Sequence, residues 1–212
     1  MSAPDWRAQR KAGMAAIAVA IVVGAALWFG IVKLMPPLVG MGALSARMVV
    51  ALKCCAIAAL FCLAAGVEAV AHERLQSAAF DPLAGSVTRR LRINLQYLQN
   101  TLEQFVVFAV GLFGLAAYCE TGDAMRAVIA TTAVWVLFRF AFCFGYHRSA
   151  AMRGMGAPGM LVGLLVLLYV CARIGGDVAG TPGAIAVVAA FLALEAVLFW
   201  GTRGRAAGGP PA

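Results

Sequence analysis

The sequence predicts an all-α integral membrane protein with six membrane-spanning helices, and three observations support this fold class. The chain of 212 residues is 63% hydrophobic and only 12% charged, with a mean hydropathy of +0.91, whereas soluble domains are about 25% charged. Its apolar runs are continuous rather than alternating, which argues against the strands of a membrane barrel. Six of these runs reach or approach the about 20 residues that a helix needs to cross a bilayer.

The predicted spans follow one another at short intervals. The first is too long for the apolar core of a secretory signal, which has about 7 to 15 residues, so we expect it to remain as a helix. No later linker is long enough to separate domains, and we expect a single membrane domain over residues 1–212. In order, the spans cover residues 13–35, 48–71, 93–118, 127–146, 158–174 and 183–200.

The basic residues predict how the spans are oriented. With a cytoplasmic N-terminus, eleven Lys and Arg residues fall on the inner side and four on the outer side, as the positive-inside rule requires. We therefore expect both termini in the cytoplasm and a location in the inner (cytoplasmic) membrane. The net charge of +8 does not indicate nucleic-acid binding, because no soluble basic face remains outside the spans.

A polar stripe opens the third predicted span. At 100° per residue its side chains fall within an arc of about 140°, and Arg92 and Arg89 extend it toward the cytoplasm. Asn94 lies on the opposite side of the helix. The stripe consists of four amides and one carboxylate: Gln96, Gln99, Asn100, Glu103 and Gln104.

A permanent cation, Arg139, interrupts the fourth predicted span, two turns before Tyr146. A charge at membrane depth costs about 2.5–3.5 kcal/mol on insertion scales and usually faces a partner inside the bundle. The third and fourth spans should be antiparallel neighbours, so we expect Arg139 to pair with Glu103. Two structural alternatives remain: Arg139 extends to the headgroups, or Glu103 serves only to join helices through hydrogen bonds.

The six cysteines form no CxxC pair and no Cys/His cluster with metal spacing. We expect free thiols that fill space between helices, and no metal site.

The polar stripe of the third span and the Arg139 and Tyr146 pattern of the fourth span together resemble the MAPEG family, the membrane-associated proteins in eicosanoid and glutathione metabolism. The family's second core helix carries Arg-x-x-x-Asn-x-x-Glu, in which Asn100 and Glu103 match the Asn and the Glu. Its third core helix runs from an arginine through Gly-Tyr into a basic loop, and RFAFCFGYHRSAAMR is similar. Residues 48–174 would form the four-helix core of a divergent, bacterial-type member, with the spans 13–35 and 183–200 as one additional helix at each end.

The resemblance implies a glutathione transferase or glutathione-dependent peroxidase that acts on lipophilic substrates. Glutathione would be the co-substrate, held between the subunits of a homotrimer. Arg153 would be catalytic by stabilising the thiolate, together with Tyr146. A nearby guanidinium favours the anion of a thiol that is otherwise mostly protonated at pH 7. The implied glutathione-binding residues are Arg92, Gln96, Asn100, Glu103, Arg139 and Arg148.

Two departures from the family pattern leave the enzyme assignment open. Gln96 replaces the arginine of the motif, and Phe142 replaces a tyrosine that is common among glutathione users. A non-enzymatic protein of the same fold that binds membrane lipids or acts as a scaffold is the alternative. A small transporter is a third hypothesis, since polar side chains can line a pathway, although no paired broken helices or inverted repeat support it.

Overall fold

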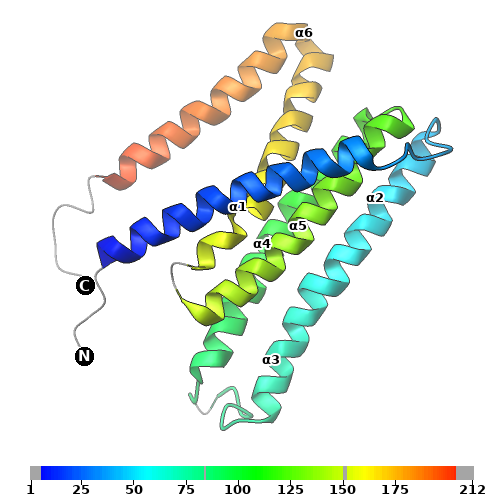
Figure 1. The fold of residues 1–212 in the computed structure, drawn as a ribbon. Helices are drawn as coiled ribbons and strands as arrows, with labels where there is room; N and C mark the ends of the chain where they lie inside the picture. Colours follow the sequence, from blue (N-terminus) through cyan, green and yellow to red (C-terminus); the bar gives the residue numbers. More distant parts are fainter. Residues whose placement is uncertain (1–5, 84, 150–151, 204–212) are drawn as a thin grey trace. The chain divides into compact units, whose positions relative to one another are not determined.

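The computed structural model describes residues 6–83, 85–149 and 152–203, and this part of the chain consists of helices and connecting turns without a strand (Figure 1). The chain divides into two compact units, Met1–Leu167 and Leu168–Ala212. The elements are α1 (Trp6–Leu34), α2 (Leu44–Ala58), η1 (Ala59–Ala64), α3 (Ala65–Leu75), α4 (Arg89–Tyr118), α5 (Gly122–Arg148), η2 (Met152–Gly156) and α6 (Ala157–Arg203).

Five helical segments of the described chain are long and apolar enough to cross a membrane: Ala8–Leu34, Leu44–Leu75, Arg89–Tyr118, Gly122–Arg148 and Met152–Gly201. The first four contain the four predicted spans between residues 13 and 146, apart from an end residue of the first. The protein is therefore a multi-pass integral membrane protein of the all-α class, as the sequence predicts.

The last segment contains the two remaining predicted spans. Helix α6 is interrupted at Ala179 (φ −135°, ψ 20°) and Gly180 (φ 63°, ψ −156°), and the second pair of angles is open essentially only to glycine. After this turn the chain reverses direction and diverges at an angle from the preceding helical residues (Figure 1). Gly175 and Gly183 meet across the turn so closely that a Cβ on either would overlap the other's backbone.

A single helical rod is formed by α2, η1 and α3 (Figure 1). Six residues within it, Ala59–Ala64, adopt a π-helical conformation, which sequence patterns did not indicate. The Cys62 carbonyl in this segment accepts a hydrogen bond from the Tyr97 hydroxyl of α4 at 3.3 Å. Next to it, Gly66 leaves room for the Tyr97 ring, so small residues bring the rod against α4.

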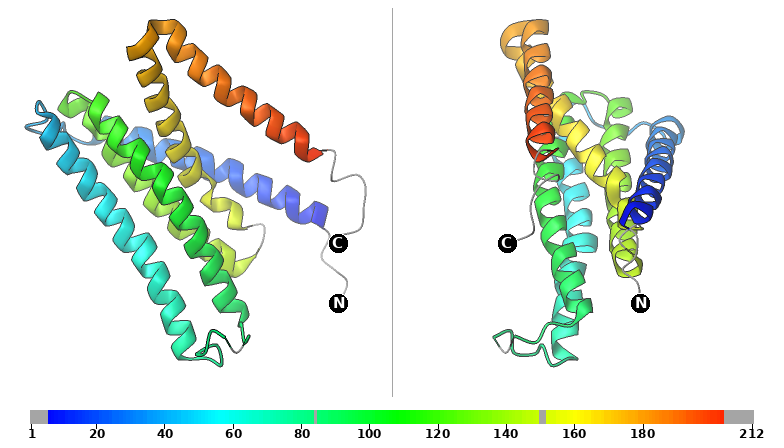
Figure 2. Two further views of the ribbon diagram at one scale, coloured as in Figure 1. Left: turned by 180° about the vertical axis from the view of Figure 1, so that it is seen from behind. Right: turned by 90° about the vertical axis from the view of Figure 1, so that its left-hand side faces the viewer.

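Helix α1 is part of the first unit and packs against α5 and η2 (Figure 2). Its Trp28 indole donates to the Thr131 hydroxyl at 3.2 Å, and Arg126 donates to the Val32 carbonyl at 2.9 Å. Ala20 adds a buried apolar contact with Val134 and Phe138. The second half of the additional N-terminal helix, from Ala20 to Val32, is thereby held to α5.

Candidate functional site

Helix α4 presents two distinct faces. Its first turn is capped by Thr88, whose Oγ1 accepts a hydrogen bond from the Leu91 amide at 3.0 Å. Asn94, Tyr97 and Thr101 are buried against the rest of the chain. The opposite face consists of exposed polar side chains: Arg92, Gln96, Gln99 and Glu103.

The burial pattern shows which way the polar stripe faces, and it differs from the inward orientation that the predicted Arg139–Glu103 pair requires. With Gln96 at zero, the buried residues Tyr97 and Thr101 point to about 100° and 140°, whereas Glu103 points to about 340°. Most of the stripe therefore faces away from this chain. Its edge residues, Asn100 and Gln104, are partly buried and turn toward α5.

Arg139 of α5 lies at that edge and is only 1% exposed. Its Nη1 donates to Asn100 Oδ1 at 3.0 Å and to Gln104 Oε1 at 2.8 Å. Gln104 Nε2 in turn donates to Asn100 Oδ1 at 3.3 Å. The guanidinium is thus held by two amides within the bundle and does not extend to the headgroups.

The predicted ion pair between Arg139 and Glu103 is wrong for this chain. Glu103 Oε1 accepts a hydrogen bond from Gln99 Nε2 at 3.2 Å on the exposed face of α4, and no cation of the described chain forms an ion pair with it. The physical reason is the rotation of α4 about its axis, which brings Asn100 and Gln104, one residue away from Gln99 and Glu103, against α5.

Aromatic rings connect Arg139 to the loop after α5. The Arg139 guanidinium lies 4.4 Å from the centre of the Phe142 ring, and the Phe142 and Tyr146 rings are 5.5 Å apart. The Arg153 guanidinium lies 5.6 Å from the centre of the Tyr146 ring, within the range of a cation–π interaction. We call these four residues the arginine–aromatic column; it leads from a buried cation to an exposed one.

Two glycines allow η2 to pack closely against the end of α5. A Cβ at Gly145 would overlap the Met152 carbonyl, and a Cβ at Gly156 would overlap the Phe142 side chain. The Arg153 amide donates to the Ser149 carbonyl at 3.3 Å. On its other side, η2 contacts α1, because a Cβ at Gly154 would lie 2.8 Å from Ile17 Cγ1. Arg153 is therefore placed over Tyr146 by packing on both sides of η2.

The predicted site residues fall into four groups. Asn100 and Arg139 are in contact, and Tyr146 and Arg153 are in contact at the other end of the column. Arg148 is exposed and lies over the Phe144 ring at 5.1 Å, outside the column. The remaining group lies on the exposed face of α4 and consists of Arg92, Gln96 and Glu103.

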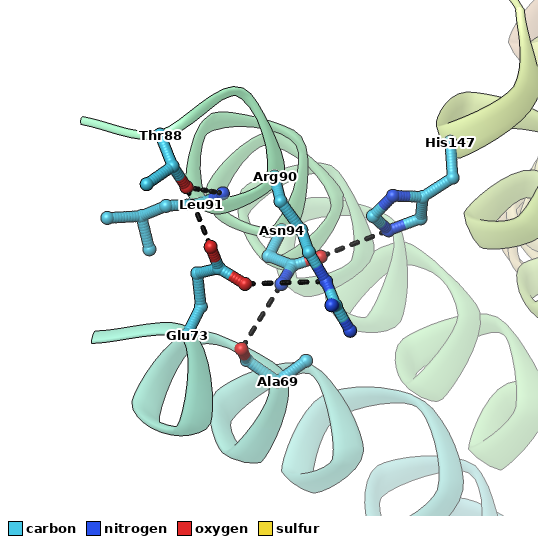
Figure 3. Close-up of polar contacts among 7 residues, drawn as sticks. All are labelled: Ala69, Glu73, Thr88, Arg90, Leu91, Asn94 and His147. Carbon is cyan, nitrogen blue, oxygen red and sulfur yellow. Dashed lines mark hydrogen bonds and ion pairs between the residues drawn. The ribbon is translucent and has the colours of Figure 1, made fainter. Parts of the chain in front are cut away.

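A polar network that sequence patterns did not reveal joins α3, α4 and α5 (Figure 3). Glu73 Oε1 accepts a hydrogen bond from the Thr88 hydroxyl at 2.8 Å, and its Oε2 forms an ion pair with Arg90 at 3.3 Å. Asn94 Nδ2 donates to the Ala69 carbonyl at 3.1 Å, and Asn94 Oδ1 lies 3.1 Å from His147 Nε2. The only sequence signal was the position of Asn94 opposite the polar stripe, on what is now the buried face.

These features define a class of protein: a multi-pass helical membrane protein with a polar face on one span and an arginine–tyrosine contact at the end of the next. The chain belongs to the MAPEG family, whose sequence model matches residues 41–176, more than half of its length. No curated protein and no solved structure matches the chain. Helix α1 and the part of α6 after its interruption lie outside the matched residues, which agrees with a four-helix core extended by one helix at each end.

Proposed function

We propose that this chain is a glutathione-dependent transferase or peroxidase that acts on lipophilic substrates reaching it through the bilayer. The observation that carries this proposal is the contact between Arg153 and Tyr146, which leaves an exposed guanidinium. A cation beside a bound thiol favours the thiolate, the form that acts as nucleophile. Family membership supports the proposal without specifying the reaction.

The charges of glutathione suit the polar face of α4. The tripeptide carries two carboxylates, which Arg92 and Arg148 can bind, and one ammonium group, which Glu103 can bind. Gln96 would supply an amide donor where the family motif has arginine. Since Arg139 is almost completely buried, we propose that it orients Asn100 for the ligand instead of contacting the ligand itself.

In the transferase reaction, Arg153 would lower the proportion of protonated thiol, and the thiol proton would pass to solvent. The thiolate sulfur would then attack an electrophilic carbon and form a thioether as the leaving group departs. Tyr146, held by Phe142 and Arg153, would donate a hydrogen bond to charge that develops in this step.

We further propose a homotrimer in the inner membrane, with both termini in the cytoplasm. Glu103 and Gln99 are exposed near the middle of a spanning helix, where a polar surface in contact with lipid is costly. A neighbouring subunit would cover this face and contribute its own α5 and η2 to the glutathione site. The excess of Lys and Arg on the inner side supports the orientation.

A lipid-binding or scaffold function is the second candidate, and Phe142 favours it. The ring that lies between Arg139 and Tyr146 has no hydroxyl to offer a thiol. If this candidate is correct, the purified protein retains a specific lipid and does not respond to glutathione.

Turnover in nanodiscs tests the enzyme proposal. We expect thioether formation from glutathione and a lipophilic aryl halide, or reduction of a lipid hydroperoxide. Arg153→Ala should lower kcat/KM by about 10²-fold or more, the loss expected for an electrostatic catalytic group. The matched control is Lys33→Ala, which removes an exposed cation in the last turn of α1, away from η2. Equal turnover by Arg153→Ala and the native protein would refute the assignment.

A further inference from the structure

His147 lies between Tyr146 and Arg148, two residues that are proposed to act on glutathione, and it contacts a different helix. Its Nε2 is 3.1 Å from Oδ1 of Asn94 on α4. The Asn94 side chain is 5% exposed, so this contact is made at the edge of the buried core. Nothing in the family match or in the proposed reaction requires it.

The Asn94 amide fixes the direction of this hydrogen bond. Its Nδ2 donates to the Ala69 carbonyl of α3 at 3.1 Å, so Oδ1 is the atom that faces His147 (Figure 3). Because Oδ1 can only accept, His147 Nε2 must carry the proton and donate. One asparagine thereby joins three helices at the point where α5 ends.

The last turn of α5 determines where η2 lies. The Ser149 amide donates to the Gly145 carbonyl at 3.0 Å, and the Arg153 amide donates to the Ser149 carbonyl at 3.3 Å. Met152 packs directly on the backbone of Gly145. A shift of this turn would therefore displace Arg153 from the Tyr146 ring.

Within the described chain, side-chain hydrogen bonds hold the second half of α5 to α4 at two levels. Arg139 makes the deeper contact, with Asn100 and Gln104, and His147 makes the contact eight residues later, with Asn94. Glu73 of α3 binds both Thr88 and Arg90 and so holds the start of α4, the helix that carries Asn94, to α3. The column from Arg139 to Tyr146 lies between the two levels.

We propose that Asn94 and His147 are positioning residues that hold the end of α5, and through it η2 and Arg153, in the arrangement that activates the thiol. The part of this inference that concerns thiol activation rests on the proposed function. The part that concerns the placement of η2 does not.

Two substitutions at one position separate the hydrogen bond from other properties of the histidine. In His147→Gln the amide nitrogen can occupy the place of Nε2 and donate to Asn94, whereas in His147→Asn the side chain is too short. Both are neutral amides of similar polarity on a partly exposed residue. Asn94→Asp is a third variant, which keeps an acceptor for His147 but loses the donor to Ala69.

Amide hydrogen exchange at Met152 and Arg153 measures the placement of η2 without glutathione. We expect exchange about tenfold faster in His147→Asn than in the native protein, through local opening, and native rates in His147→Gln. The Ala124 amide, which donates to Thr121 Oγ1 at the other end of α5, should not change in either. Native exchange rates at Met152 and Arg153 in His147→Asn would overturn the proposal.

The ultraviolet absorbance of the glutathione thiolate tests the second part on the same variants. We expect the thiolate fraction to fall about tenfold in His147→Asn, equivalent to about one pKa unit, and to recover in His147→Gln, with glutathione affinity nearly unchanged. An unchanged thiolate fraction in His147→Asn would refute the positioning of Arg153. If the native protein itself gives no thiolate signal, the proposed function fails, and faster exchange in His147→Asn still supports the placement of η2.

Discussion

At the scale of single residues, Arg139 is defined by its burial. A guanidinium that is 1% exposed needs hydrogen-bond partners inside the protein. Its Nη1 donates to the Asn100 and Gln104 side-chain oxygens at 3.0 and 2.8 Å, whereas its buried Nε has no partner among the described residues. The charge of Arg139 was evident from the sequence, as was its need for a partner. Its partners were not, because Asn100 and Glu103 differ by only 60° around the helix.

The stability contributed by these hydrogen bonds can be measured with Arg139→Met, which preserves the approximate length of the side chain and removes the donors. Asn100 and Gln104 would each lose a partner in a buried place, so we expect the free energy of unfolding to fall by about 1–3 kcal/mol. Arg148→Met is the matched control, because among the described residues its exposed guanidinium contacts only the Phe144 ring. Reversible unfolding in mixed detergent micelles gives both values, and equal stability of the two variants would contradict the role of Arg139.

At the level of helices, the five membrane-crossing segments of the described chain were predictable, with the last one divided into two predicted spans, because length and hydropathy determine whether a segment can cross a bilayer. The rotation of each helix was not predictable, since it depends on contacts such as that of Gly66 with the Tyr97 ring. The π-helical turn at Ala59–Ala64 and the contact of η2 with α1 also depend on packing between distant segments. As a result, the site residues could be listed from the sequence. Which of them contact the rest of the chain, and which lie on the exposed face of α4, could not be predicted.

The position of η2 leads to a prediction about glycine. In Gly145→Ala the added methyl group would overlap the Met152 carbonyl, so η2 must shift, and we expect a loss of about 1–3 kcal/mol in stability. Gly30→Ala is the control, because a Cβ there meets nothing within 4 Å inside α1 and should stabilise the helix by up to about 1 kcal/mol. Thermal unfolding of both variants in detergent is the measurement. A Gly145→Ala protein as stable as Gly30→Ala would show that η2 does not pack as described.

At the scale of the whole molecule, the exposed polar face of α4 is the feature that a single chain does not explain. About one turn after Glu103 this face continues with an apolar side chain, Val106, which is 56% exposed. Helix α1 packs elsewhere, on α5 and η2, and so leaves this face of the first unit open. The proposed homotrimer would bury this face.

Native mass spectrometry tests the homotrimer. We expect a mass of three chains for the native protein and a shift toward single chains in Val106→Trp, because the added ring would obstruct close packing of two subunits. Val22→Trp is the control on α1, where the side chain is 69% exposed and should remain in contact with lipid. Dissociation in Val22→Trp without dissociation in Val106→Trp would place the subunit contact on α1.

Arg153 is proposed to activate the glutathione thiol, and ultraviolet difference absorbance of the purified protein in detergent measures this activation. Titration with glutathione should give a saturable thiolate signal in the native protein and in Lys33→Ala, and this signal should be absent in Arg153→Ala. A signal of equal size in Arg153→Ala would contradict the role of that residue. A native protein without any signal would contradict glutathione chemistry altogether and favour lipid binding by the same MAPEG fold.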